Sequence, residues 1–552
     1  MADDVEALLK RAEHAERERD AFAPLMREIY RYTMPERDGW SSYGLGQDRQ
    51  NLVYDSSGVA SVSRFANRLQ MTVFPAGQRW SQLALPQELA NGDAAKKLQE
   101  DLEEATNIMF RHVHASNFDA EINPVCHDVG AGVGCMLVEN GRLGQKRPGA
   151  PLFRCQAVPP ANLAFDEGPW GTVEGVFFSQ TMAGRLVKRT YPDIKLTKEM
   201  KAAIDQDPEG DVSLLQATTY DAEKLRWAFQ VVDRSHKTVL LTRWYRTNPW
   251  IIIRWTKVPG ESRGRGPLMV ALPNIRVSNK LMELMLITGS FDATPTYTAA
   301  DDGVMNPDVI SILPGDIIPV RSNGGNFGPS LKILDRPGNL QFSDALLDRM
   351  HTSVRQLLFD NPLPPEVQVG LTATEIIERM RLFQQDTGSF GRLHQDAVVP
   401  LTLRFVDILE EAGEFPPERF SKLFEALQSN MVQVRVVSPI ARSQDQADLQ
   451  SLMSLIAGAA NLGTFGAQML QAAVNPDRAG LYIAERSGIP TKLIPTETET
   501  ASRHKAEAET AQQQLLATSP VAAQVAGALA GGMANGGAKG GPGGAPAPEQ
   551  PI

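Results

Sequence analysis

The sequence predicts an α+β fold in which helical segments flank a strand-rich middle region. Apolar residues recur at helical spacing before residue 130 and again after residue 272. Between Leu152 and Lys257 the pattern changes to short β-branched and aromatic runs separated by turn residues. Together these patterns indicate helices packed around an antiparallel sheet.

The composition is that of a globular protein that remains where it is made. The 552 residues are enough for several substructures with a buried core. A run of about 18 apolar residues does not occur, so no transmembrane helix is predicted. The acidic N-terminus, Met1–Glu6, is unlike a secretory signal, and we expect a cytosolic protein.

Cysteine content and net charge indicate which kinds of protein the chain can be. Cys126, Cys135 and Cys155 are too few and too scattered for a disulfide framework, so we expect free thiols. The net charge of −10 argues against a broad basic surface that grips nucleic acid by neutralising phosphates. It is compatible with a protein that lets DNA slide past.

The N-terminal region is predicted to be helical. A helix over Asp3–Thr33 carries dense mixed charges, which favour a solvated helix packed along one edge over a partner-binding helix. Three further helices are expected over the following ranges: Asp55–Thr72, Asp93–His114 with Asp93 as the N-cap, and Phe118–Val129.

A glycine-rich stretch follows, Gly130–Gly134, and raises the question of nucleotide binding. It follows a helix and precedes the strand Cys135–Glu139, the reverse of the strand–loop–helix order that phosphate binding needs. We therefore interpret it as a tight helix-to-strand connection.

Histidines and cysteines in the same region raise the question of a zinc site: His112, His114, Cys126, His127 and Cys135. They lack a compact Cys-x-x-Cys or His-Glu-x-x-His spacing. His112 and His114 lie about 200° apart on a helix, so ordinary core or surface histidines are favoured. No metal or cofactor is predicted.

The strand-rich region is expected to contain these runs, with a helix near Thr197–Gln206: Val173–Ser179, Leu225–Val232, Thr238–Tyr245 and Trp250–Lys257. Its tryptophans are Trp227, Trp244, Trp250 and Trp255. Such residues can stack bases, but cross-strand packing is the favoured interpretation.

The stretch from Gly264 to Glu378 has the most distinctive order of elements. We predict a helix that begins at Pro273 and ends near Phe291, with Val277 and Leu284 among its apolar positions. Short strands over Val309–Leu313 and Ile317–Val320 follow.

A second helix is predicted with Ser343 as its cap and an apolar stripe that includes Leu347, Val354 and Leu358. Three prolines make Asp360–Leu371 an extended loop.

The C-terminal third is predicted to be mainly helical. A third helix of this stretch opens on the capping box Thr372–Glu375 and runs to Ala412, bent near Gly388, Gly391 and Pro400. Met431–Val437 is a strand, and helices occupy most of 439–518. The tail from 519 to 552 is rich in Ala, Gly and Pro and is expected to be disordered.

The motifs, in this order, resemble the portal, or head-to-tail connector, proteins of short-tailed bacteriophages. The residues that carry the resemblance are Trp250–Trp255, Gly264–Pro267, the helix–strands–helix excursion, Leu371–Glu375 and Ser438–Arg442. It extends over nearly the whole chain apart from about the last thirty residues.

The resemblance implies a ring of typically twelve subunits at one capsid vertex, through which double-stranded DNA is packaged and ejected. Implied partners are the terminase, the major capsid and scaffolding proteins, and tail adaptor proteins, with no membrane. The implied layout is as follows: N-terminal helical segment 1–54, wing 55–263, first stem helix 264–291, clip 292–342, second stem helix 343–359, tunnel loop 360–371, kinked wing helix and closing strand 372–438, and crown 439–518.

Three sets of site residues follow from the resemblance. The tunnel loop that approaches DNA comprises Asn361, Pro362, Leu363, Pro364, Pro365, Glu366, Val367 and Gln368. Candidate channel-facing stem residues are Arg276, Lys280, Glu283, Arg349 and Arg355. Candidate clip residues for docking of the terminase and tail are Asp301, Asp302, Asp308, Asp316 and Arg321.

Three alternative functions remain open from the sequence. The nearest is another ring-forming head-tail adaptor or structural virion protein. A nucleic-acid-processing enzyme comes next, although a Gly-x-Ser-x-Gly elbow or Walker loop in the right context is missing. A membrane-associated scaffold is the least favoured.

Overall fold

The computed structural model describes residues 2–43, 46–86, 93–143, 150–293, 297–299, 331–333, 340–360, 389–415 and 432–437, with a few isolated positions after residue 450. The chain divides into two compact units, residues 1–84 with 102–450 and residues 85–101 with 451–552. In the second unit the description covers the first turns of helix α3, where the Gln99 side chain accepts a hydrogen bond from the Leu85 amide at 3.0 Å. The fold described below is that of the first unit.

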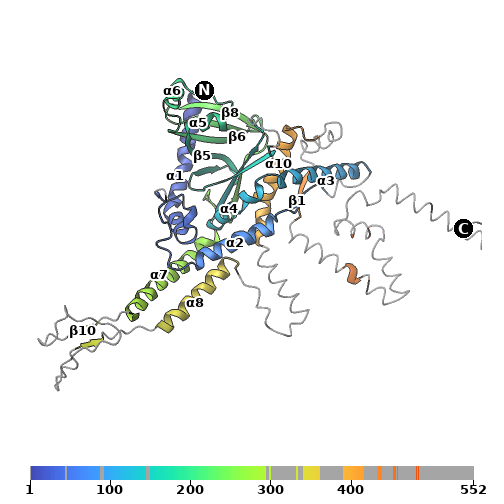
Figure 1. Ribbon diagram of the computed structural model, residues 1–552. Helices are drawn as coiled ribbons and strands as arrows, with labels where there is room; N and C mark the ends of the chain where they lie inside the picture. Colours follow the sequence, from blue (N-terminus) through green and yellow to red (C-terminus); the bar gives the residue numbers. More distant parts are fainter. Residues whose placement is uncertain are drawn as a thin grey trace, which may run out of the picture. The chain divides into compact units, whose positions relative to one another are not determined.

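A five-stranded antiparallel sheet is the largest β element of this unit (Figure 1). Its strands pair in chain order: β4 (Leu163–Glu167), β5 (Val173–Ala183), β6 (Asp211–Asp221), β7 (Arg226–Asp233) and β8 (Thr238–Tyr245). Helices α5 (Gly184–Thr190) and α6 (Lys198–Gln206) lie in the β5–β6 connection, and the Thr197 hydroxyl caps α6 by accepting from the Met200 amide. The predicted strands Val173–Ser179, Leu225–Val232 and Thr238–Tyr245 are therefore confirmed as β5, β7 and β8, but β4 and β6 were missed.

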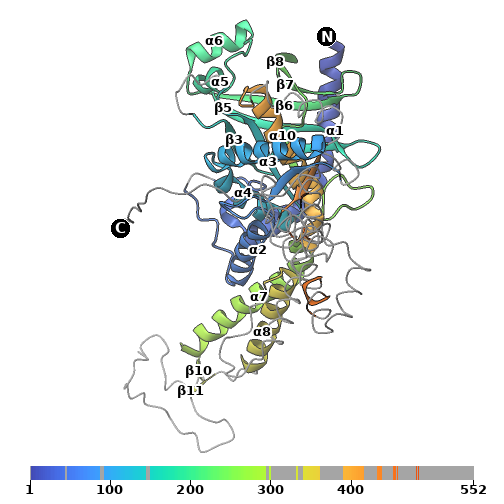
Figure 2. The same cartoon turned by 90° about the vertical axis from the view of Figure 1, so that its right-hand side faces the viewer.

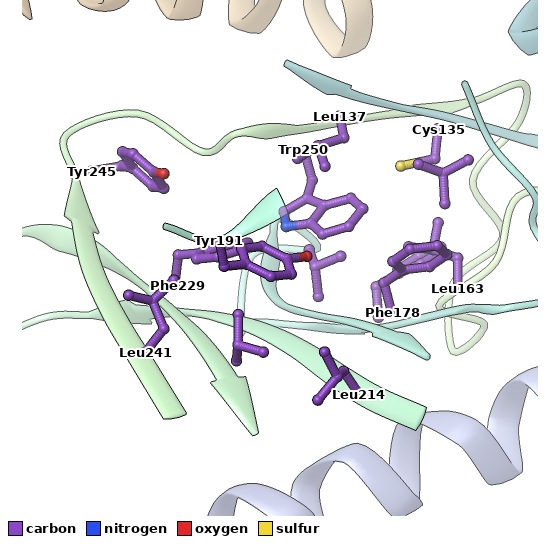
Figure 3. Packing of buried hydrophobic residues seen from close by; sticks show 14 of the residues in the cluster. Cys135, Leu137, Leu163, Phe178, Tyr191, Leu214, Phe229, Leu241, Tyr245 and Trp250 are labelled. Atoms are coloured by element: carbon purple, nitrogen blue, oxygen red, sulfur yellow. The ribbon is translucent and has the colours of Figure 1, made fainter. Parts of the chain in front are cut away.

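One face of this sheet packs against a three-stranded antiparallel sheet. The order of the smaller sheet is β3 (Phe153–Val158), β2 (Val133–Asn140) and β9 (Trp250–Arg254). Cys135, Leu137 and Trp250 of the smaller sheet are buried with Phe178, Phe229 and Tyr245 of the larger one (Figure 3). The indole of Trp250 donates to the Thr218 hydroxyl at 2.8 Å, which satisfies its polar atom inside this core.

Helix α1 (Ala2–Thr33) covers the opposite face of the large sheet (Figure 1). Its small residues Ala12 and Ala15 are buried there with Phe177 of β5. The charged run is partly bound to the sheet as well, because Arg11 forms an ion pair with Asp166 and Glu16 one with Arg234. The prediction of a solvated helix packed along one edge is confirmed.

Trp227 and Trp250 pack across strands or between the sheets, as predicted, whereas Trp255 follows β9 and packs against Phe65. Trp227 of β7 lies 5.3 Å, centroid to centroid, from Tyr220 of β6. Trp244 of β8 is partly exposed and lies under the Lys224 ammonium group, 4.0 Å from its ring centroid. Trp250 and Trp255 are buried.

Packed aromatic rings hold four helices against the smaller sheet. The helices are α2 (Ser57–Val73), α3 (Asp93–His114), α4 (Phe118–Ala131) and α10 (Val399–Glu411). Phe118 of α4 lies 5.8 Å from both Trp80 and Phe405, and Phe405 lies 4.5 Å from Phe153 of β3. Strand β1 (Ser81–Ala84) follows Trp80 and pairs with β12 (Gln433–Val436), which confirms the late strand predicted from the sequence.

The third helix predicted for the central stretch is irregular where the structure describes it. Ser389–Arg392 is a 3-10 turn and His394–Val398 a π-helical turn, and only then does α10 begin. Gly391 lies in the 3-10 turn, and Pro400 lies in the first turn of α10. Pro400 cannot donate a backbone hydrogen bond, which fits a change of helix type at this point. The opening of the predicted helix, Thr372–Gly388, lies outside the described residues.

The glycine-rich stretch is a tight connection from α4 to β2, as predicted. Gly132 has a φ of 127°, and the Trp255 amide donates to its carbonyl at 3.0 Å. A Cβ at Gly266 would lie 2.2 Å from the Gly130 carbonyl oxygen, and one at Gly132 would lie 2.3 Å from that of Gly264. Two glycine-containing segments therefore meet backbone against backbone, which side chains would prevent.

This contact predicts a selective effect of alanine. Gly266→Ala should destabilise the fold by about 2 kcal/mol, because the added methyl group meets backbone that cannot rotate away. Gly289→Ala is the matched control, since a Cβ there meets nothing within 4 Å on a helix, and it should be neutral or slightly stabilising. Urea unfolding midpoints measure both, and equal midpoints for the two variants would contradict the account.

Candidate functional site

Two helices form an antiparallel pair that projects from the sheets: α7 (Pro267–Ala293) and α8 (Leu340–Leu357), side by side in Figures 1 and 2. Short strands β10 (Tyr297–Ala299) and β11 (Leu331–Ile333) pair where α7 ends and before α8 begins. The Asn274 amide group donates to the Ser353 hydroxyl at 2.9 Å and links the two helices. The two predicted helices are confirmed with different boundaries, while β10 and β11 are strands that were not predicted.

Both helices begin earlier than predicted. α7 starts at Pro267, and Pro273 lies inside it and is exposed. Either proline suits a first helical position, so that rule could not choose between them. α8 starts at Leu340, which makes Ser343 an interior residue rather than a cap.

Helix α7 has one apolar face that packs against its own chain and a second that is exposed. Leu268, Leu272 and Ile275 pack with Met26, Ile29 and Tyr30 of α1 and with Val354 and Leu358 of α8. Val277 and Leu284, which the sequence analysis included in its apolar stripe, are 44% and 47% exposed. The predicted stripe of α8 is confirmed, since Leu347, Val354 and Leu358 are buried.

The outer face of α7 is therefore apolar as well. Val270 is 63% exposed, and Val270, Val277 and Leu284 follow one another at intervals of seven residues. At about 100° per residue this spacing keeps them on one side of the helix, roughly opposite the buried Ile275. We call Val270, Val277 and Leu284 the outer stripe. The exposed face of α8 is polar instead, with Asp344, Asp348, Thr352 and Arg355.

A buried carboxylate fixes both helices to the start of α2. The Asp55 carboxylate accepts from the Ser57 amide and hydroxyl at 3.0 and 2.7 Å and lies 3.0 Å from Nε2 of His351 on α8. The Asp55 amide donates to the side-chain oxygen of Asn279 on α7 at 3.1 Å. Burial alone would raise the pKa of Asp55, but hydrogen bonds from Ser278 and Ser57 and the charge of His351 hold it below its usual value.

The lowered pKa predicts how acid acts on this attachment. A carboxylate with a depressed folded pKa stabilises the fold above its unfolded pKa, and this contribution is lost as the pH falls through the folded value. Asp55→Asn should cost about 2 kcal/mol at neutral pH, and the difference from the unmodified chain should shrink below about pH 4.

Urea titrations between about pH 7 and about pH 3 would measure this difference. Asp344→Asn is the control, since Asp344 is exposed on α8 and should change the midpoint little at any pH. A gap between Asp55→Asn and the unmodified chain that stays constant over the whole range would contradict the assignment.

The five candidate stem charges are exposed or partly exposed, and three of them are already paired. Arg276 forms an ion pair with Glu28 of α1, and the Lys280 ammonium lies 2.9 Å from the Glu283 carboxylate. Arg349 and Arg355 are exposed on α8 and form no ion pair with any residue that the structure describes. The paired charges offer little excess positive charge for phosphates.

Four aromatic rings meet where α8 ends and where the chain re-enters the described structure. Phe359 follows α8 and Phe390 lies in the 3-10 turn, with centroids 5.4 Å apart. Both lie near Phe65 of α2, at 6.5 and 6.1 Å, and near Trp255, at 5.8 and 5.6 Å. We call Phe65, Trp255, Phe359 and Phe390 the aromatic clasp. It brings together both ends of the segment 361–388.

The backbone turns sharply at the clasp. Phe359 has a φ of 56°, a left-handed conformation that costs a non-glycine residue about 1–2 kcal/mol. The Asp360 amide donates to the Arg355 carbonyl at 2.7 Å and the Phe359 amide to that of Gln356 at 3.2 Å, which is a Schellman helix end. Glycine would adopt this conformation without strain but has no side chain to pack. The contacts of the Phe359 ring offset the cost of the left-handed backbone.

An ion pair completes the turn. The Asp360 side chain is 6% exposed, and its carboxylate accepts from the Arg64 guanidinium at 2.9 Å and from the Ser61 hydroxyl at 3.3 Å. Both partners belong to α2, so the first residue after the turn is bound to the same helix that carries Phe65. Nothing in the sequence signalled these contacts, because the paired positions lie about three hundred residues apart.

The remaining predicted site residues lie outside the described part of the chain. They are the tunnel-loop residues Asn361, Pro362, Leu363, Pro364, Pro365, Glu366, Val367 and Gln368, and the clip residues Asp301, Asp302, Asp308, Asp316 and Arg321. The same holds for the predicted strands Val309–Leu313 and Ile317–Val320 and for nearly all of 439–552. Their roles stay predictions.

In the described part of the chain, the cysteine and histidine side chains that could act in catalysis or metal binding are buried or lie apart from one another. Burial raises the pKa of the Cys126, Cys135 and Cys155 thiols, and His112 lies 3.7 Å from the Glu414 carboxylate. Within the described ranges, no three His, Cys, Asp or Glu side chains are grouped to hold a metal ion. Nor does any helix in those ranges combine the length and apolarity needed to cross a membrane.

The site is thus a projecting helix pair with an apolar outer stripe, the arrangement on which the resemblance to portal proteins rests. Comparison with known families agrees: the model of the bacteriophage head to tail connecting protein matches residues 5–494. The chain belongs to this family of phage portal proteins, which are structural components of the head–tail junction and not enzymes. None of the curated proteins compared with the chain matches it.

Proposed function

We propose that the chain is the subunit of a closed ring, of twelve copies, set at one capsid vertex of a short-tailed phage. Double-stranded DNA would be packaged and ejected through its axis, with the terminase and later the tail docking on it. The family match over residues 5–494 carries the proposal. We propose the major capsid protein, the scaffolding protein and tail adaptor proteins as its further partners.

The helix pair supports this assignment and suggests the layout. We assign α7 and α8 as the stem, the strands around β10 and β11 as part of the clip, and the sheets with their covering helices as the wing. The loop over Asp360–Leu371 would be the tunnel loop and 439–518 the crown. The Schellman end of α8 then lies at the start of the tunnel loop.

The outer stripe supports contact between neighbouring subunits. A ring of identical subunits uses two different surfaces of each copy, one for each neighbour. One face of α7 is covered by its own chain, while Val270, Val277 and Leu284 are left to solvent. Covering three half-exposed aliphatic side chains contributes about 1 kcal/mol each at every interface.

The outer stripe therefore predicts which substitutions open the ring. Val277→Gln combined with Leu284→Gln should reduce ring formation, because polar side chains remove the gain from covering the stripe. Thr352→Gln on the polar face of α8 is the control and should leave the rings intact. Light scattering after size exclusion measures the mass, and an unmodified chain that stays monomeric in every salt would refute the ring.

The charge pattern of the stem supports passage of DNA without tight binding. Tight binding to DNA requires many unpaired cations that displace counterions from phosphates. Arg276 and Lys280 are paired with Glu28 and Glu283, and the chain as a whole carries a net charge of −10. The five aspartate and arginine positions of the clip stay proposed docking residues for the terminase and tail.

The tunnel-loop assignment predicts a defect in DNA handling without a defect in assembly. Deleting Leu363–Gln368 should leave rings and their incorporation into capsids intact but impair packaging or retention of the genome. The loop carries only two charges, Asp360 and Glu366, and of these Asp360 is bound to Arg64. Full, stable and infectious particles from the deletion, at the normal rate, would disprove a role for this loop.

Added positive charge should also impair packaging, but through attraction to DNA rather than through loss of the loop. Glu366→Lys with Gln368→Lys should slow translocation, because lysines hold passing phosphates, and raised salt should relieve the effect. Glu366→Gln with Gln368→Asn is the uncharged control. Packaged DNA per particle against time measures the rate, and slowing that is independent of salt would contradict an electrostatic cause.

A further inference from the structure

The aromatic clasp joins two points that are distant in sequence but adjacent in space. Phe359 and Phe390 contact one another, and each also contacts Phe65 and Trp255. Each of the two rings is therefore held by contacts with the body of the protein as well as by the other ring. Phe390, Phe65 and Trp255 are buried, which anchors the four rings in the body of the protein. Phe359 and Phe390, described residues on either side of 361–388, therefore lie together against α2.

We propose that the aromatic clasp and the Arg64–Asp360 ion pair are a positioning device for the segment that follows Asp360. The rings hold its two ends together, and the ion pair sets the direction in which the chain leaves α8. The proposal rests on the assignment of Asp360–Leu371 as the DNA-facing loop for its functional consequence. Its structural claim stands without that assignment.

The two parts of the device have different physical roles. Ring contacts are weakly directional, and aromatic pairs at 5–6 Å tolerate several arrangements. A guanidinium–carboxylate hydrogen bond constrains orientation much more. Without Arg64, the ring contacts would still retain the ends, while Asp360 would be left buried without its cation and would turn toward solvent.

The left-handed turn at Phe359 adds a reason for the ion pair. An aromatic residue at a φ of 56° is strained, so the turn persists only if its surroundings hold it. The residue before it, Leu358, is buried, and the residue after it, Asp360, is bound to Arg64 and Ser61. Loss of Arg64 removes the constraint on one side of the strained residue.

Pulsed electron paramagnetic resonance tests the structural claim directly. Spin labels are placed by Glu366→Cys and Ala345→Cys, the second on the exposed face of α8, while the three native cysteines are buried. Labelled subunits are diluted with unlabelled ones, so that distances within one subunit dominate. Arg64→Gln should broaden the distance distribution, and Arg64→Lys, which keeps the cation, should restore a narrow one.

Two comparisons separate positioning from general stability. Arg185→Gln breaks an exposed ion pair with Glu209 and is the matched control, with an unchanged distribution expected. Phe359→Leu keeps an apolar side chain and should broaden the distribution too. Arg64→Gln should lower the unfolding midpoint more than Arg185→Gln, because it leaves the buried Asp360 carboxylate without its cation, and Arg64→Lys should restore the midpoint.

Packaging assays on the same variants complete the test. A broadened distribution with a loss of packaged DNA, both reversed by Arg64→Lys, is the expected result. A distribution that stays narrow in both Arg64→Gln and Phe359→Leu overturns the proposal, whatever the packaging result. If the distribution broadens while deletion of Leu363–Gln368 leaves packaging normal, the positioning device stands and the DNA-facing role of the loop falls.

Discussion

The close approach of two backbones at Gly132 and Gly266 is the constraint on which the helix pair depends. Since α7 begins at the residue after Gly266, the position of that glycine against the Gly130 carbonyl decides where the helix leaves the sheets. The Trp255 amide, bound to the Gly132 carbonyl, places the end of β9 at the same point. A side chain at either glycine would separate the stem from the smaller sheet.

The same contact organises the aromatic clasp. A Cβ on Gly130 would lie 3.2 Å from the Phe65 ring and 3.4 Å from Leu268, so α4 passes directly beneath both. Trp255 is held by its backbone bond to Gly132 and packs edge-on against Phe65 at 5.5 Å. The stem, the end of α8 and the re-entry at Phe390 are thus fixed to one rigid set of backbone and ring contacts, in which a small displacement at one member is felt by the others.

The periodicity of apolar residues in the sequence predicted most helices and strands. It failed where one sequence pattern is compatible with two different structures. The strand Thr238–Tyr245 and the α8 stripe were predicted because local alternation and helical spacing are decided by nearby residues. The start of α7 was wrong because Pro267 and Pro273 satisfy the same rule. The apolar positions Val277 and Leu284 were found from their spacing, but spacing reveals an apolar face and not what covers it, so the separate buried face at Leu268, Leu272 and Ile275 was missed. The Arg64–Asp360 pair was unpredictable, since nothing local links those positions.

The apolar faces of α7 bear on assembly, and its charges bear on the passage of DNA that we propose. An apolar face left uncovered by its own chain favours association, and in a ring each weak contact is repeated at every interface, so modest burial suffices. A basic surface would add affinity for phosphate, which would slow a moving duplex. Pairing Arg276 with Glu28 and Lys280 with Glu283 removes that affinity within each subunit. The helix pair can therefore associate through apolar surface while Arg276 and Lys280 are neutralised within the chain, so the interaction that favours association differs from the one that would bind phosphate.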